Sequence, residues 1–187
     1  MILTPFRHAL PCALACFGFV LLIALGARVD VAVPGSPVPQ SLQTLVVLAA
    51  GLALGPRWGL AAAALYVLAG ALGLPVFADG ASGLSVLAGP TAGYLAGFVL
   101  AAGFVGALSD DLARGRRGRQ IVTALGLGLV GHVLILAPGW AGLALRLGPA
   151  AALSAGVVPF LWGMVVKSAI VALAAPLLLG LRQRLNI

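Results

Sequence analysis

Six long apolar stretches, interrupted by Gly, Pro and charged residues, constrain the fold of this chain of 187 residues more than any other feature. They cover approximately 6–27, 41–54, 58–74, 89–109, 120–137 and 155–181. A helix needs about 20 apolar residues to cross a bilayer, and the stretches are of that order, two of them shorter. Hydrophobic residues make up 62% of the chain and charged residues only 8%, which excludes an ordinary soluble domain. The sequence therefore predicts an all-α integral membrane protein, a single domain over residues 1–187 that forms a bundle of six transmembrane helices.

The segments between the apolar stretches indicate how the helices connect. Only Gly55, Pro56 and Arg57 separate the second stretch from the third, so these two are expected to form an antiparallel hairpin with a tight turn. Residues 74–83 (LPVFADGASG) are too broken for a span. We expect them to form an ordered extracellular loop between the third and fourth helices. Helices are favoured over barrel strands, which alternate in hydrophobicity over about 10 residues.

The arginines indicate how the helices are oriented in the membrane. With six spans, both termini and two connecting loops lie on one side, which then holds Arg7, Arg57, Arg114, Arg116, Arg117, Arg119, Arg182 and Arg184. Only Arg28 and Arg146 fall on the other side. The positive-inside rule predicts a multi-pass protein of the cytoplasmic membrane with both termini in the cytoplasm. The first span is longer than the apolar core of a signal peptide, about 7 to 15 residues, so we expect it to be retained.

Several classes of function are disfavoured by what the sequence lacks. The net charge of +7 is spread between apolar runs without an aromatic RNA-binding pattern, so no nucleic acid partner is expected. Cys12 and Cys16 lie one helical turn apart with no His or acid near them, which predicts packing and no metal site. No P-loop motif occurs, so any energy for transport must come from another polypeptide or an ion gradient. We expect no cofactor.

Small residues recur at a spacing of four in three of the stretches. The rows are Gly51, Gly55 and Gly59, then Gly89, Gly93 and Gly97, then Ala9 and Ala13. Such rows let helix backbones approach closely in lipid. We expect the two glycine rows to pack inside the protein, whereas the alanine row leaves both internal packing and a partner interface open.

Lys167 is the one ionisable residue that the pattern places well inside a span. A lone ammonium within the membrane is costly, so such residues usually face a cavity or a counter-ion, although long side chains near a helix end can reach the interface. The sequence contains no Glu, and Asp30, Asp79, Asp110 and Asp111 lie in predicted loops. Without an acid inside the membrane, the natural partner of Lys167 is the anion of a ligand.

An enzymatic alternative rests on Ser82 and His132. Ser82 in Gly80-Ala81-Ser82-Gly83, together with a His in the fifth span, matches the loose pattern of intramembrane serine proteases such as the rhomboids. A serine nucleophile needs its base within hydrogen-bond reach and an oxyanion hole, neither of which a sequence can show. A histidine within a span more often packs between helices. We therefore expect no enzyme and no catalytic residues.

Four segments taken together resemble the BioY family, the biotin-specific substrate-binding (S) components of energy-coupling-factor (ECF) transporters. They are 38–45 (VPQSLQTL), 54–59 (LGPRWG), 73–78 (GLPVFA) and 87–95 (LAGPTAGYL). The similarity continues in order from about residue 9 to residue 180, nearly the whole chain. The family's six-helix fold agrees with the number of apolar stretches.

The resemblance implies a biotin pocket on the extracellular side, lined by the loop after the third helix and by the fourth to sixth helices. Lys167 matches the lysine of the family's PFLxGDxxK segment, which is PFLWGMVVK over 159–167 here. Met164 stands where the family has an aspartate, so the chain keeps half of a pair that contacts biotin. Asp79 is the best candidate for a replacement acceptor. The further polar residues in matching segments are Gln43, Thr44, Asp79, Ser82, Thr91 and Tyr94, of which Tyr94 fits a packing role equally well.

The resemblance also implies partners. S components dock on a transmembrane coupling protein that is bound to two ATPase subunits, through an AxxxA face on the first helix that Ala9 and Ala13 match. Some members take up biotin without these subunits, and the sequence does not distinguish the two cases. The nearest rival function is that of an S component for another small vitamin, which a pocket altered by Met164 would favour.

Overall fold

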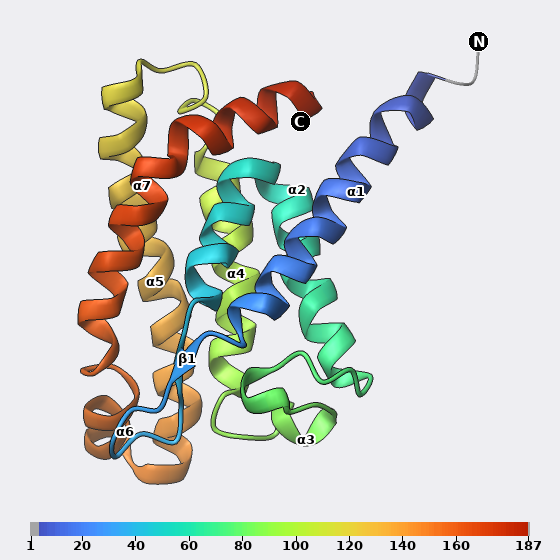
Figure 1. The fold of residues 1–187 in the computed structure, drawn as a ribbon. Coiled ribbons are helices and arrows are strands. Elements are labelled where there is room, and N and C mark those ends of the chain that lie inside the picture. Colours follow the sequence, from blue (N-terminus) through green and yellow to red (C-terminus); the bar gives the residue numbers. More distant parts are fainter. Residues whose placement is uncertain (1–3, 187) are drawn as a thin grey trace.

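The computed structural model describes residues 4–186, and long helices packed side by side make up most of it (Figure 1). The elements in chain order are α1 (Thr4–Gly26), β1 (Asp30–Val31), β2 (Gln40–Ser41), α2 (Gln43–Ala71), the short 3-10 helix η1 (Ala78–Gly80), α3 (Leu84–Leu87), α4 (Ala92–Leu108), α5 (Arg117–Leu147), α6 (Pro149–Gly156) and α7 (Phe160–Leu185). The two strands pair antiparallel, with Asp30 opposite Ser41. Each strand has only two residues, which is too short for an alternating pattern that would predict it from the sequence.

The long helices are those of a membrane protein. Among residues 4–186, α1, α2, α5 and α7 are long and apolar enough to cross a bilayer, and α4 is a shorter apolar helix. Their outward faces carry exposed large apolar side chains, among them Leu14, Val122 and Leu177. Soluble proteins rarely expose such continuous apolar surface, so lipid is the solvent of these faces. The chain is therefore a multi-pass membrane protein.

Helix α2 is a hairpin rather than one straight helix. Gly55 interrupts it with φ +72° and ψ −174°, a backbone conformation that residues with a Cβ avoid. The two arms then run side by side in opposite directions (Figure 1). A Cβ added to Gly59 would lie 3.0 Å from Gly51 Cα, whereas residues eight apart in a straight helix are about 12 Å apart. This geometry agrees with the tight turn expected at Gly55, Pro56 and Arg57.

The glycine rows lie at close contacts between helices, as expected. A Cβ on Gly51 would come 2.7 Å from the Ala102 carbonyl oxygen of α4, and one on Gly97 would come 2.7 Å from Ile135 Cα of α5. Larger side chains at these positions would force the helices apart. The prediction of internal packing is confirmed for these rows except Gly89, which contacts only its own turn.

The ends of two predicted spans were wrong. The fifth stretch was expected to end at residue 137, but α5 continues through Pro138 to Leu147 and ends where Gly148 takes φ +82°. Proline is tolerated inside membrane helices because its neighbours satisfy the freed carbonyl. The last stretch was expected to begin near 155, but α7 begins at Phe160, after the separate helix α6.

The first turn of α1 and the last turn of α7 lie at the same end of the bundle (Figure 1). The start of α1, the turn of α2 and the end of α7 lie there, while α3, α6 and the β1–β2 segment lie at the opposite end (Figure 1). This arrangement groups the arginine-bearing segments as the sequence predicted. Near this end the thiols of Cys12 and Cys16 contact the carbonyls of Leu185 and Trp58 at 3.6 and 3.7 Å, which fits a packing role.

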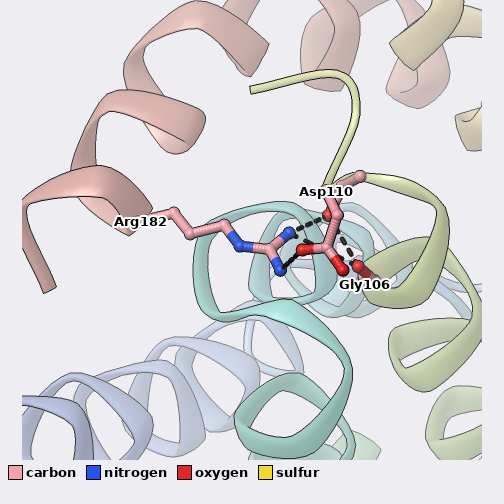
Figure 2. Close-up of polar contacts among 4 residues, drawn as sticks. Gly106, Asp110 and Arg182 are labelled. Atoms are coloured by element: carbon pink, nitrogen blue, oxygen red, sulfur yellow. Dashed lines mark hydrogen bonds and ion pairs between the residues drawn. The ribbon is translucent and has the colours of Figure 1, made fainter. Parts of the chain in front are cut away.

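Arg182 has a structural role that the sequence did not reveal, because it was counted only among the charges that set orientation. Its side chain is 4% exposed and donates hydrogen bonds to the Gly106 carbonyl and to Ser109 Oγ at the end of α4. It also forms an ion pair with Asp110, in the segment after α4 (Figure 2). A Cβ on Gly55 would lie 2.7 Å from Arg182 Nη2. One side chain therefore joins α7, α4 and the turn of α2.

Candidate ligand-binding site

A cavity of about 350 Å³ lies among the helices at the end of the bundle opposite to the termini. Its wall is formed by 37–39 between the two strands, the start of α2, the segment from Phe77 to Thr91, and inward residues of α4, α5 and α7. Most of the lining side chains are apolar, such as Val38, Phe98 and Leu136. A cavity of a few hundred Å³ with few polar groups suits a small organic ligand.

Lys167 reaches this cavity from α7 and is 8% exposed. Its Nζ donates to the Ser41 carbonyl at 2.6 Å and to Thr44 Oγ1 at 3.3 Å. No carboxylate pairs with it among the side chains of residues 9–186, where the one ion pair joins Arg182 and Asp110. An ammonium has three N–H donors, so one remains for a ligand.

Thr44 and His132 continue the polar wall from Lys167. His132 Nε2 lies 3.1 Å from Thr44 Oγ1, and Nδ1 lies 2.9 Å from the Gly128 carbonyl and 3.1 Å from Ser168 Oγ. Thr44, His132 and Lys167 all line the cavity, whereas Ser168 lies behind it. Three helices thus contribute one connected group of polar side chains.

Gln43 lines the cavity, but its amide is engaged by the protein. Its Oε1 accepts a hydrogen bond from Ser41 Oγ at 3.0 Å, and its Nε2 donates to Tyr66 Oη. Tyr66 Oη in turn donates to the Val76 carbonyl at 3.1 Å. Gln43 therefore fixes the start of α2 to the segment after α2.

Tyr94 packs rather than presenting its hydroxyl to the cavity. Its Oη donates to the Gly156 carbonyl at 2.7 Å, and its ring lies where a Cβ of Gly139 would be. The ring centroid is 6.3 Å from that of Phe160. The ring lines the cavity while the hydroxyl ties α4 to the end of α6.

Asp79, Thr91 and Met164 also line the cavity, from η1, the start of α4 and α7. Asp79 has φ +55°, a left-handed conformation that Asp adopts more readily than most residues. Among the side chains that the structure describes, those of residues 9–186, none forms an ion pair with its carboxylate. Met164 is half-buried, one helical turn before Lys167. The structure thus places both an acid and Met164 in the lining of the same cavity.

Ser82 is the one predicted pocket residue that does not line the cavity. Both ring nitrogens of His132 face Gly128, Ser168 and Thr44, and no hydrogen bond joins His132 to Ser82 in the described part of the chain. A serine nucleophile needs its base within reach. The geometry gives the protease alternative no support.

The structure adds residues to the site that sequence reasoning missed. Tyr66 is fully buried and lines the cavity, with its ring 5.6 Å from that of Phe77. His132 was considered only as a protease base or a packing residue, although it lines the cavity beside Thr44. A polar aromatic side chain inside an apolar run is the only sequence signal that these two share.

The helices and the cavity define a multi-pass membrane protein with an internal site for a small molecule. The profile of the BioY family matches residues 7–184. The biotin transporter BioY of Thermotoga maritima is 38% identical over 164 residues, 84% of this chain and 89% of that protein. The chain therefore belongs to the BioY family.

A second relative and a solved structure are also similar to this chain. The biotin transporter BioY2 of Lactococcus lactis subsp. cremoris is 33% identical over 159 residues, 81% of this chain and 85% of that protein. A crystal structure of the S-component for biotin from an ECF-type ABC transporter superposes with a TM-score of 0.83 over 95% of this chain and 93% of that chain. Its sequence is 20% identical, so it supports the fold alone.

Proposed function

We propose that this protein binds biotin at the outer face of the cytoplasmic membrane and delivers it unchanged into the cell, as the S component of an ECF transporter. The observation that carries this proposal is the cavity with Lys167 on its wall, in a chain of the BioY family. Biotin has a sulfur-containing ring fused to a ureido ring, and an apolar alkyl chain that ends in a carboxylate. Apolar walls with one buried cation and a few hydroxyl and carboxyl groups match that chemistry.

Mass spectrometry of small molecules retained by the purified protein tests the ligand directly. Biotin is the expected molecule, and titration calorimetry should then give saturable binding. Lipoic acid is a suitable control, because it has a similar carboxylate chain and a sulfur ring but no ureido group. Recovery of another vitamin, with no binding of added biotin, would favour the alternative S component.

Six membrane spans form part of the proposal: α1, the two arms of α2, α4, α5 and α7. The hairpin geometry of α2 and the apolar character of α4 support this count. Both termini then lie in the cytoplasm, and the segment between α2 and α4, which contains η1 and α3, forms the extracellular loop. The exposed arginines 114, 116, 117 and 119 lie on the cytoplasmic side in this arrangement.

Cysteine accessibility in intact cells tests the orientation. In a variant with Cys12 and Cys16 replaced by alanine, a cysteine at Gly115 should resist a membrane-impermeant reagent, because it lies in the cytoplasmic loop. A cysteine at Ala81, which is exposed in the segment near the cavity, should be labelled. The opposite labelling pattern would invert the proposed topology.

Ala9 and Ala13 are proposed to face the coupling protein, which itself binds the two ATPase subunits. Both residues are exposed on α1, far from the cavity lining, and lie four residues apart on one helix face. Small side chains leave a shallow groove that a partner helix can approach closely. This exposure favours a partner interface over internal packing.

Tryptophan at Ala13 should reduce biotin uptake severalfold while leaving the affinity of the purified protein unchanged. The physical reason is that the indole obstructs a close helix contact outside the pocket. Uptake of labelled biotin and calorimetric titration measure the two quantities. Leu21→Trp, an exposed position further along α1, is the matched control. Full uptake by the Ala13 variant would show that this face is not used.

Asp79 is proposed to accept the ureido N–H bonds that Met164 cannot accept, since a thioether is a weak acceptor. Asp79→Asn should weaken biotin binding about tenfold, because a hydrogen bond to a charged acceptor contributes about 1.5 to 3 kcal/mol and one to a neutral amide oxygen about 1 kcal/mol. Met164→Ala should have a smaller effect on the dissociation constant. A silent Asp79→Asn together with tighter binding by Met164→Asp would refute the compensation.

A further inference from the structure

The polar side chains of Lys167, Thr44, His132 and Ser168 form one continuous hydrogen-bonded group between α2, α5 and α7. His132 and Ser168 are almost fully buried. Inside a membrane protein each polar atom must find a partner of the right kind, because an unpaired donor or acceptor is costly. The donors and acceptors can therefore be assigned along this group.

The Gly128 carbonyl determines which nitrogen of His132 carries the proton. A carbonyl oxygen only accepts, and it lies 2.9 Å from Nδ1, so Nδ1 carries the hydrogen and donates it. Ser168 Oγ, 3.1 Å from the same nitrogen, is then a second acceptor. With the proton on Nε2 instead, two lone pairs would face each other at the Gly128 contact. A doubly protonated ring would place a second positive charge close to Lys167.

The hydrogen bonds between His132, Thr44 and Lys167 then have only one possible set of donors and acceptors. Nε2 of His132 is an acceptor, so the Thr44 hydroxyl donates its single hydrogen to it across 3.1 Å. The lone pairs of Thr44 Oγ1 are left to accept from Lys167 Nζ at 3.3 Å. Since an ammonium only donates, the direction is the same along the whole path from Lys167 through Thr44 and His132 to Gly128.

We propose that His132 is a positioning residue for ligand binding: it fixes the Thr44 hydroxyl as an acceptor and so holds the Lys167 ammonium at the cavity wall. This inference rests on the proposed function. Without the imidazole, the Thr44 hydrogen is free to turn toward Lys167, where it opposes the ammonium. Lys167 then keeps only the Ser41 carbonyl, which belongs to β2 at the cavity end of the bundle.

A double-mutant cycle on biotin affinity tests the positioning role. His132→Leu should raise the dissociation constant about fivefold in the wild-type background, and less than about twofold in a Lys167→Met background. Thr44→Val should behave like His132→Leu, whereas Thr44→Ser, which keeps the hydroxyl, should lose less affinity than Thr44→Val. Equal losses in both backgrounds would overturn the proposal, because they indicate direct ligand contact or general damage by His132→Leu.

The protonated nitrogen can be measured without any ligand, which separates this inference from the identity of the substrate. In ¹⁵N-histidine-labelled protein, the signals that disappear in His132→Leu belong to His132, since His8 is the only other histidine. The expected spectrum is that of the neutral Nδ1–H form. An Nε2–H or doubly protonated ring would overturn the assignment. If this spectrum appears but biotin does not bind, the proposed substrate is wrong, while the assigned hydrogen-bond directions from Lys167 to Gly128 are kept.

Discussion

Replacement of Lys167 by alanine is expected to weaken biotin binding at least about tenfold, a loss of about 1.4 kcal/mol. The side chain is 8% exposed, and its ammonium already donates to Ser41 and Thr44, so the remaining N–H is held ready for the ligand. A buried ligand oxygen that loses this charged donor loses a hydrogen bond that contributes about 1.5 to 3 kcal/mol. Calorimetric titration of the purified protein in detergent measures the change.

Two variants separate the charge from the packing of this side chain. Lys167→Met keeps a long side chain without the ammonium and should lose as much affinity as alanine does. Val166→Ala, at the exposed neighbouring position on α7, should bind like the wild type. Unchanged affinity of both Lys167 variants would mean that the ammonium only anchors Ser41 and Thr44, and the ligand would then have to bind elsewhere in the cavity.

The sequence predicted the parts of this fold that depend on local chemistry. Apolar stretches of membrane length indicated the helices, and Gly55 with Pro56 indicated the hairpin because few other residues can form that turn. Lys167 was expected at a cavity because a cation deep in an apolar run is costly unless it faces a cavity or a counter-ion. The structure places it on the cavity wall. The same reasoning could not find the end of α5, since Pro138 is a breaker in water and is tolerated among membrane helices.

The sequence could not show what depends on partners distant in the chain. Gln43 was predicted to contact the ligand, but its amide is engaged by Ser41 and Tyr66, a residue 23 positions away. The role of His132 likewise depends on Thr44, from another helix. Polar residues of a membrane bundle can be recognised from the sequence, but their donors and acceptors are paired only by the packing of the helices.

Loss of the Arg182 side chain is expected to lower the free energy of unfolding by about 2 to 3 kcal/mol. Hydrogen bonds to charged groups contribute about 1.5 to 3 kcal/mol each, and the Arg182 side chain, which is 4% exposed, donates such bonds to the Gly106 carbonyl and to Ser109. The ion pair adds little, because the side chain of Asp110 is 62% exposed and therefore screened by solvent. Arg182→Leu should show the loss in thermal unfolding, whereas Arg184→Leu, at an exposed position on the same helix, should change the midpoint little.

A substitution at Gly55 distinguishes a specific contact of Arg182 with the turn of α2 from a general loss of packing in Arg182→Leu. Alanine at position 55 meets two costs: the strain of φ +72° with ψ −174°, about 1 to 3 kcal/mol, and a Cβ 2.7 Å from Arg182 Nη2. The strain persists whatever residue stands at 182, but the clash disappears with leucine there. Gly55→Ala should therefore cost less in the Arg182→Leu background than in the wild type. If the losses in unfolding free energy from the two substitutions are strictly additive, the guanidinium does not contact the turn of α2. Its contacts with α4 alone would then account for the loss in Arg182→Leu.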